Sequence, residues 1–326
     1  MYKYIFIDLD GTLLNDAKEI SEENIKWLNR AYKEKGITTI ITTGRQYGFV
    51  EDLYKKYNCS FGDYVIASNG AIIKNVKTGD YINKDILNKE EIETLNRICQ
   101  EEGLDFIIIY DEKNAYMERK DGITPKSKMQ KDKIYVDNII ELLENNENIE
   151  TNIVVMGAEK NELNNAIKKV ERNIIWDYSP ISEYRKKDEE VDIREYYFDV
   201  MKKGVNKKNA IKKVMDKFGA NHDEIIVIGD GGNDLPMFEY AKLKIAMENG
   251  SDALKQKADY ITDTNNNDGV AKAIRKLIAT GAHDIEIEEA AVKNGMRTLN
   301  QSCMNHILDG KTTIEELVKK AIEYLS

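Results

Sequence analysis

Short apolar runs alternate with amphipathic stretches in the first part of the chain. Three runs favour strands by their β-branched and aromatic residues, at 2–7, 38–42 and 64–67. The stretches 21–35 and 49–57 repeat apolar residues at helical spacing, and Ser21 is a suitable N-cap for the first of them. Strands that alternate with helices predict a parallel sheet covered on both faces, with ligands bound beyond the carboxyl ends of its strands.

The same alternation returns in the last third of the chain. A strand is predicted over 198–201, a helix over 206–218, a strand over 225–228 and a further helix over 270–278. These elements complete the sheet that the first part of the chain begins.

A longer stretch of mixed pattern, residues 84–194, separates the two blocks. Its best strands lie at 106–110 and 153–156, and its length suits an inserted α+β domain. We therefore expect an α/β fold, with a Rossmann-like, doubly wound core built from residues 1–83 and 195–280.

Composition narrows the classes of function. The chain has 48 basic and 58 acidic residues, and its net charge of −10 disfavours a protein that binds nucleic acid or an anionic membrane. No stretch approaches the roughly 20 apolar residues that span a bilayer. The three cysteines are far apart and form no metal-binding pattern. We expect a cytoplasmic protein without nucleic-acid or membrane partners.

Two carboxylates follow the first predicted strand, in the segment D-L-D-G-T. Asp8 and Asp10 are two residues apart, so in an extended chain they project from the same side. A bound divalent cation or a shared proton would relieve their repulsion, and Mg²⁺ suits an all-oxygen site. The alternative is an Asp-Gly turn that binds nothing.

A second acidic loop, G-D-G-G-N-D at 229–234, follows another apolar strand. Its glycines would let Asp230 and Asp234 approach a cation or a phosphate closely, and Asn233 can orient the carboxylates. A calcium loop is the alternative, but the regular ligand spacing of an EF-hand is absent from this sequence.

Four separated motifs resemble those of phosphatases in the haloacid dehalogenase superfamily, specifically the Cof-type (class IIB) branch with a large type-2 cap. They are D-L-D-G-T-L-L at 8–14, I-T-T-G-R at 41–45, G-V-N-K at 204–207 and G-D-G-G-N-D at 229–234. Shorter segments at 68–71 and 268–271 resemble the same branch, and the resemblance covers residues 1 to about 279. It implies that residues 84–194 form a mobile cap that sets substrate choice.

The resemblance also implies a role for each acidic residue. Asp8 would be the nucleophile that forms an aspartyl-phosphate, and Asp10 would be the general acid and base. Asp8, the Asp10 carbonyl and Asp230 would ligate Mg²⁺, while Asp234 would be a ligand or would orient the metal's waters. Asp10 separates phosphatases from the family's dehalogenases, which lack it, and from its transport ATPases, which have Thr there.

Other motif residues would bind the transferring phosphoryl group. By resemblance they are Thr43 in preference to Thr42, together with Gly44, Arg45, Lys207 and Asn233. Judged without its motif, Lys207 resembles an ordinary surface lysine at the start of a helix, where the macrodipole disfavours a cation unless an anion is near. The order of the motifs favours the phosphate-binding interpretation.

These inferences predict a Mg²⁺-dependent phosphatase that hydrolyses small phosphorylated metabolites, with sugar phosphates as the leading class. A phosphomutase is the enzymatic alternative. A catalytically silent regulatory or scaffold protein is the alternative from another class, although the intact Asp8, Asp10, Lys207 and Asp230 argue against it.

The residues after 280 depart from the Cof-type pattern. Segments at 291–299 and 309–317 resemble the C-terminus of type II secretion and type IV pilus assembly ATPases, but the chain has no G-x-x-x-x-G-K-[ST] motif. An apolar stripe at helical spacing predicts that 281–326 is a short helical extension. That stripe packs on the chain's own core or, alternatively, contacts a second copy or a protein partner.

Overall fold

The computed structural model describes residues 2–110, 112, 114–118, 133–146, 150–158, 160–187 and 192–280. The predicted helical extension at 281–326 lies outside the described residues. Among the described residues, no helix combines the length and the apolar character that a membrane span requires.

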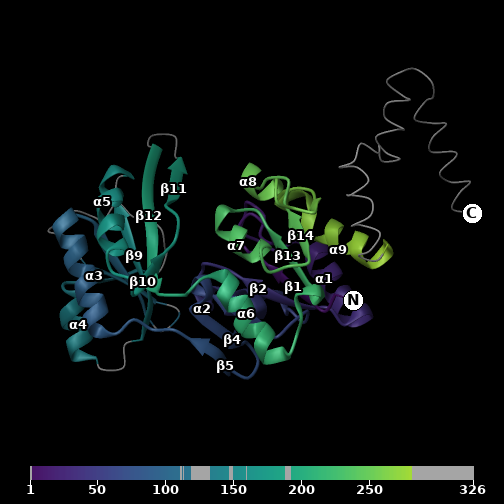
Figure 1. Cartoon of the computed structure of the whole chain (residues 1–326), viewed down its shortest axis with the longest axis horizontal. Coiled ribbons are helices and arrows are strands. Elements are labelled where there is room, and N and C mark those ends of the chain that lie inside the picture. The colour runs from purple at the N-terminus through teal and green to yellow at the C-terminus, as the bar shows by residue number, and fades with distance from the viewer. Residues whose placement is uncertain are drawn as a thin grey trace, which may run out of the picture. The chain divides into compact units, whose positions relative to one another are not determined.

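The larger sheet of the described residues has eight strands in the order β15-β14-β13-β1-β2-β3-β4-β5 (Figure 1). Its strands are β1 (Tyr4–Ile7), β2 (Thr38–Thr42), β3 (Tyr64–Ala67), β4 (Ile72–Asn75), β5 (Tyr81–Lys84), β13 (Ile225–Gly229), β14 (Leu243–Ala246) and β15 (Tyr260–Ile261). Neighbours pair in parallel from β15 to β3, and antiparallel pairs join β3 to β4 and β4 to β5. The expected parallel α/β sheet is confirmed.

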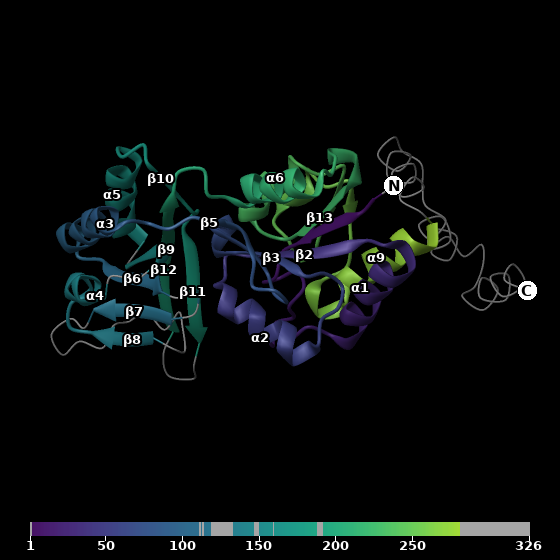
Figure 2. The ribbon, with the colours of Figure 1, turned by 90° about the horizontal axis from the view of Figure 1, so that it is seen from below.

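Helices cover both faces of this sheet. They are α1 (Glu22–Lys35), α2 (Tyr47–Tyr57), α6 (Lys207–Phe218), α7 (Leu235–Phe238), α8 (Asp252–Lys255) and α9 (Gly269–Thr280). Figure 2 shows α1 and α2 on one face and α6 on the other. The helix predicted at 21–35 is confirmed, because Ser21 is its N-cap and accepts a hydrogen bond from the Asn24 amide.

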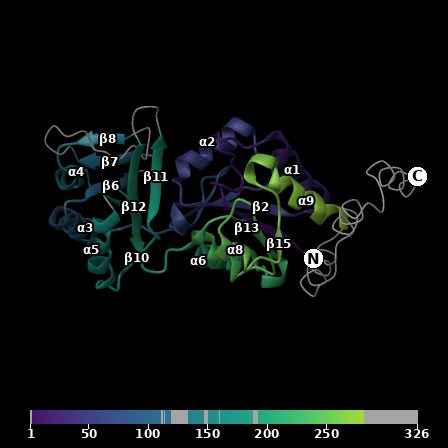
Figure 3. The ribbon, with the colours of Figure 1, turned by 90° about the horizontal axis from the view of Figure 1, so that it is seen from above.

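A second sheet is formed by the insert, the part of the chain between β5 and α6. Its order is β10-β12-β9-β6-β7-β8, and β11 pairs with β12. Its strands are β6 (Asp105–Tyr110), β7 (Asn114–Glu118), β8 (Lys133–Val136), β9 (Thr151–Ala158), β10 (Trp176–Tyr178), β11 (Ser182–Lys187) and β12 (Asp192–Lys202). Figure 3 shows β6, β7 and β8 in succession across it.

Three helices of the insert, α3 (Lys89–Glu102), α4 (Ile139–Asn145) and α5 (Lys160–Glu171), pack on one face of this sheet. The two faces follow from strand geometry, because successive side chains point to opposite sides. On β9, Val154 and Met156 belong to the apolar cluster under the helices, whereas Ile153 and Val155 belong to the cluster on the other face.

One expectation about the chain's organisation is wrong. The strand predicted at 198–201 was expected to return the chain to the core, but it belongs to β12, which pairs with β9, β10 and β11. The insert's sheet therefore continues to Lys202, past the boundary expected at residue 194. A buried strand has the same apolar character in either sheet, so local sequence does not reveal its partners.

A turn between β6 and β7 brings the insert into contact with the core. The buried Glu112 carboxylate accepts hydrogen bonds from Lys74 Nζ on β4 at 2.8 Å and from the Tyr81 hydroxyl on β5 at 2.5 Å. Its carbonyl accepts the Gly48 amide in the first turn of α2 at 2.9 Å. These hydrogen bonds form a polar contact between the insert and the core.

Candidate active site

The carboxyl ends of two neighbouring strands bring the predicted acidic residues together. β1 lies between β13 and β2, so Asp8 after β1 is next to Asp230 after β13. Oxygen atoms of Asp8, Asp230 and Asp234 lie within 4.8 Å of one another. Parallel strands end at the same edge of a sheet, which is why segments more than 200 residues apart in sequence form one cluster.

Lys207 lies inside this cluster. Its side chain is 2% exposed, and Nζ donates to Asp8 Oδ1 at 2.5 Å and to Asp234 Oδ1 at 2.7 Å. The interpretation of Lys207 as a surface lysine is therefore wrong. Asn206 is the N-cap of α6, and the two carboxylates supply the negative charge that a cation at a helix N-terminus requires.

Asp234 organises the second acidic loop. Its Oδ2 accepts the amides of Asp230 and Gly231, both at 3.0 Å, while Oδ1 accepts Lys207. Both oxygens are thus bonded to protein groups. Asp230 Oδ1 accepts the Thr12 hydroxyl at 2.9 Å, which links the loop to the turn after β1.

Gly11 allows that turn to lie against Asp230. Its φ is +74°, and a Cβ at this position would lie 2.3 Å from Asp230 Oδ2. A side chain here would be strained by the left-handed backbone and would also collide with the carboxylate. The glycine of D-L-D-G-T is therefore required by both conformation and space.

Burial and like charge raise the pKa values of Asp8 and Asp230. Burial is the main reason that the pKa of Asp8 is well above its ordinary value; the Asp234 charge adds to the rise and Lys207 opposes it. Burial and the Asp234 charge raise the pKa of Asp230 to about 6. The all-oxygen donor set and its excess of negative charge over the single Lys207 ammonium fit a Mg²⁺ ion.

Asp10 has a different environment. Arg45 binds it through both oxygens, with Nε to Oδ2 at 2.5 Å and Nη2 to Oδ1 at 2.6 Å, and Lys18 Nζ donates to Oδ1 at 2.9 Å. The Arg45 guanidinium also lies 4.0 Å from the centre of the Phe49 ring. Burial would raise the pKa of Asp10, but the hydrogen bonds and charges of Arg45 and Lys18 outweigh it and lower this pKa.

The loop at 43–45 connects β2 to α2. Thr43 is buried, and its hydroxyl oxygen accepts the Arg45 amide at 3.1 Å. Thr42 instead donates its hydroxyl to the Ile40 carbonyl at 3.3 Å, so its side chain is turned back along the strand. Of the two threonines, Thr43 is the one whose hydroxyl belongs to the loop.

Asn233, another predicted phosphate-binding residue, is exposed. Its Oδ1 folds back over Gly231, where an added Cβ would lie only 2.4 Å away. The structure therefore places Asn233 at the rim of the acidic loop rather than among the three carboxylates.

Three residues beside the site were missed in the sequence. Lys18 pairs with Asp10, Asp199 on β12 accepts the Asn69 side-chain amide at 2.8 Å, and Tyr197 lies two residues before Asp199. None belongs to a motif. The one available signal was the segment at 68–71, whose resemblance to the Cof-type branch marked the turn that holds Asn69.

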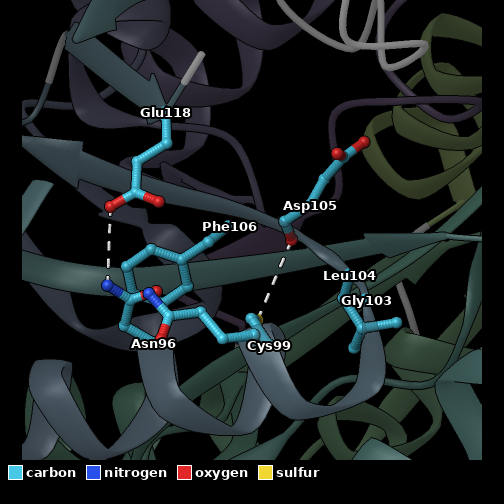
Figure 4. Close-up of a pocket in the computed structure, with 8 residues that line it drawn as sticks. Asn96, Cys99, Gly103, Leu104, Asp105, Phe106 and Glu118 are labelled. Carbon is cyan, nitrogen blue, oxygen red and sulfur yellow. Dashed lines mark hydrogen bonds between the residues drawn. The ribbon is translucent and has the colours of Figure 1, made fainter. Parts of the chain in front are cut away.

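A separate hollow of about 490 Å³ lies in the insert, between α3 and strands β6 and β7 (Figure 4). At one end, Glu118 Oε1 accepts the Asn96 side-chain amide at 3.5 Å and the Ile139 backbone amide at 2.9 Å. None of the residues from the four motifs lines this hollow.

Comparison with known proteins places these features in context. Residues 5–274 match the family model of haloacid dehalogenase-like hydrolases. The chain is 30% identical over 283 residues to the putative phosphatase YxeH of Bacillus subtilis, an alignment that covers 85% of this chain and 99% of that protein.

Two further proteins are similar over most of their length. The 5-amino-6-(5-phospho-D-ribitylamino)uracil phosphatase YcsE of Bacillus subtilis is 30% identical over 276 residues, covering 85% of this chain and 96% of that one. A solved phosphatase of the haloalkanoate (HAD) enzyme superfamily from Bacteroides thetaiotaomicron has a TM-score of 0.66 and is 26% identical. The match covers 84% of this chain and 94% of that one. The family match ends at residue 274, so the resemblance of the tail to secretion ATPases stays a prediction.

Proposed function

The chain belongs to the haloacid dehalogenase-like hydrolases, and on that premise we propose that it is a Mg²⁺-dependent phosphatase of small phosphate monoesters, sugar phosphates above all. One observation carries the proposal: Asp8 is held by Lys207 inside a cluster of carboxylates, while Asp10, two residues later, is paired with Arg45. The two carboxylates therefore have separate environments, as a nucleophile and an acid require. Relatives named as phosphatases support hydrolysis as the reaction.

Asp8, Asp230 and the Asp10 carbonyl would hold the cation, with Asp234 fixing Lys207 and the 230–231 backbone around it. When bound, Mg²⁺ supplies positive charge to the oxygens of the transferring phosphoryl group. We assign Asp234 to the support of the site because both of its oxygens already accept protein hydrogen bonds.

Asp8 is the proposed nucleophile. Lys207 fixes its Oδ1, which leaves the other oxygen to attack phosphorus. An Asp8–phosphorus bond forms as the bond to the leaving oxygen breaks, and Asp10 protonates that oxygen. Asp10 then takes a proton from water, which attacks phosphorus and displaces Asp8, giving inorganic phosphate.

Arg45 connects substrate binding to the protonation of Asp10. A guanidinium fork that binds a carboxylate through two hydrogen bonds also fits two oxygens of a phosphate. When a substrate phosphate takes over Arg45, Asp10 loses its principal counter-charge, and its pKa rises from its present lowered position. Asp10 can then carry the proton that the leaving group needs.

The insert contributes a polar group for the leaving group. Burial, followed by the charges of Asp199 and Asp10, raises the pKa of Tyr197, while its hydrogen bond with Ser182 and the Arg45 charge lower it. A neutral phenol can donate to and accept from hydroxyl groups. This supports a polyhydroxylated leaving group, such as a sugar or a ribityl chain like that in the substrate named for a relative.

The test is release of phosphate from p-nitrophenyl phosphate and from a panel of sugar and ribityl phosphates, with and without Mg²⁺. We expect activity that requires Mg²⁺ and that Asp8→Asn abolishes, because an amide cannot form the aspartyl-phosphate. Activity that survives Asp8→Asn would overturn the proposal. Return of labelled phosphate from a sugar bisphosphate to sugar would identify a phosphomutase instead.

The partners of the chain are part of the same proposal. We propose a small phosphorylated metabolite as its ligand, and a second copy of the chain or a protein partner as the contact of residues 281–326.

A further inference from the structure

Asn69 connects the 43–45 loop to the insert. Its backbone amide donates to the Thr43 carbonyl at 3.1 Å, and its side-chain Nδ2 donates to Asp199 Oδ2 at 2.8 Å. Its remaining side-chain atom, Oδ1, faces Gly44 so closely that a Cβ there would lie 2.9 Å away. One buried amide side chain thus lies between the predicted phosphate-binding loop and a strand of the insert.

The turn that carries Asn69 is fixed to the loop by its backbone. This turn, η1 (Ser68–Gly70), follows β3, and the Ser68 amide donates to the Arg45 carbonyl at 2.8 Å. The φ of Asn69 is 54°, a left-handed conformation that asparagine tolerates better than most residues. Any shift of the Asn69 side chain would therefore be passed to the loop through short, direct contacts.

Asp199 is equally well fixed on the insert. Its backbone amide donates to the Ser179 hydroxyl and its carbonyl accepts the Ser179 amide, both at 2.9 Å. Among the ion pairs of the described residues, none includes Asp199. Burial raises the pKa of Asp199 to about 6, and the Asn69 hydrogen bond acts in the opposite direction. A carboxylate with an amide rather than a cation as its partner is costly to bury, so stability does not explain it.

We propose that Asn69 and Asp199 are a positioning pair that aligns the 43–45 loop with β12 of the insert. The inference rests on the proposed function and extends it, because it states how the insert and the phosphate-binding loop are coupled. Neither side chain need touch the substrate. The pair acts through Thr43 and Gly44, so its loss lowers the rate of phosphoryl transfer for every substrate rather than the affinity for one leaving group.

The turn at Glu112 provides a matched control. It is also a buried carboxylate of the insert that accepts hydrogen bonds from the core, in its case from Lys74 and Tyr81. Its side chain has no contact with the 43–45 loop among the hydrogen bonds described. If any polar contact between insert and core served equally well, Glu112→Ala would reproduce the loss seen at Asp199.

The experiment measures kcat and KM of the full chain with p-nitrophenyl phosphate and with a sugar phosphate. For Asn69→Ala and Asp199→Ala, we expect kcat to fall about 10- to 100-fold for both substrates, with KM changed less than about threefold. The double variant should be no worse than the more affected single variant, because the two residues act as one unit. Asp199→Asn keeps an acceptor for Asn69 and should restore kcat to within about threefold of the parent.

Multiplicative losses in the double variant, an unchanged kcat in Asp199→Ala, or an equal loss in Glu112→Ala would each overturn the pairing. Thermal denaturation checks that every variant is folded. If the parent protein shows no phosphatase activity, the proposed function fails, and the pairing is then tested by the affinity for orthovanadate, measured by calorimetry. Asn69→Ala and Asp199→Ala should weaken orthovanadate binding equally. An unchanged affinity would overturn the inference.

Discussion

The two sides of the candidate site differ although both begin at the end of β1. On one side, Asp8 and Asp234 enclose Lys207, and their side chains are 7%, 0% and 2% exposed. On the other side, Asp10 is 38% exposed and meets Arg45 and Lys18 near solvent. The pKa of Asp8 is raised mainly by burial; burial also acts to raise that of Asp10, but the hydrogen bonds and charges of Arg45 and Lys18 together lower it.

The comparison shows how one short segment can supply two chemical roles. Charges that are fully buried must keep their partners, because an unpaired charge in a low-dielectric interior is very costly. Charges near solvent can exchange partners at little cost. We therefore propose that Lys207 fixes Asp8 as the nucleophile, whereas Arg45 can leave Asp10 to bind a substrate phosphate.

Removing Lys207 should have the largest effect. Lys207→Met leaves Asp8 and Asp234 buried without their cation, so we expect a loss of about 3–5 kcal/mol in the free energy of unfolding and no measurable turnover. Lys208→Met is the matched control, because this adjacent lysine is 38% exposed and pairs with Glu239. Urea denaturation without metal measures the difference, and a loss below about 1 kcal/mol would show that the cluster tolerates unpaired charge.

Removing Arg45 should come next, and should affect activity rather than stability. Arg45→Ala removes a bidentate partner of Asp10 and of the proposed phosphate, so kcat/KM should fall about 100-fold while stability changes by less than about 1 kcal/mol. Arg30→Ala is the control, because Arg30 forms the same kind of fork with Glu34 and lies over the Trp27 ring. Equal activity in the two variants would remove Arg45 from the mechanism.

Asp199 offers a third environment, because it is half-buried and has no cation among its described partners. Its pKa of about 6 exceeds the roughly 3.9 of an unfolded chain. The folded protein therefore loses stability as the pH rises from the lower of these values to the higher. Asp199→Asn should therefore stabilise the protein by up to about 3 kcal/mol at pH 8, and the gain should disappear as pH falls towards 4. Denaturation curves across this range measure it, and a variant less stable than the parent at pH 8 contradicts it.

Lys18 should matter least. Its side chain is 55% exposed, and it forms one ion pair with Asp10, which Arg45 already binds through two hydrogen bonds. Lys18→Met should lower kcat/KM by less than about threefold, and added salt should reduce the difference further. A tenfold loss in kcat/KM that persists in high salt would contradict this prediction, because an exposed ion pair should be screened by salt.

The amino-acid sequence determined the elements and the list of site residues. The strands β2 and β3 occupy the residues predicted for them, and α1 begins after its predicted N-cap, Ser21. Motif spacing and order put Asp8, Asp10 and Lys207 on the list of site residues. These features depend on neighbours a few residues apart, so their causes are present in the local sequence.

Tertiary structure decided which groups meet. It placed β12 in the insert's sheet and set the Asn69 amide on Asp199, 130 residues later. It also buried Lys207 between two carboxylates and turned Arg45 towards Asp10, so that the pKa values of two acids from one segment are shifted in opposite directions. Burial and partner charge arise only when distant segments pack together, which is why residue type and spacing could name the carboxylates but not assign their pKa values.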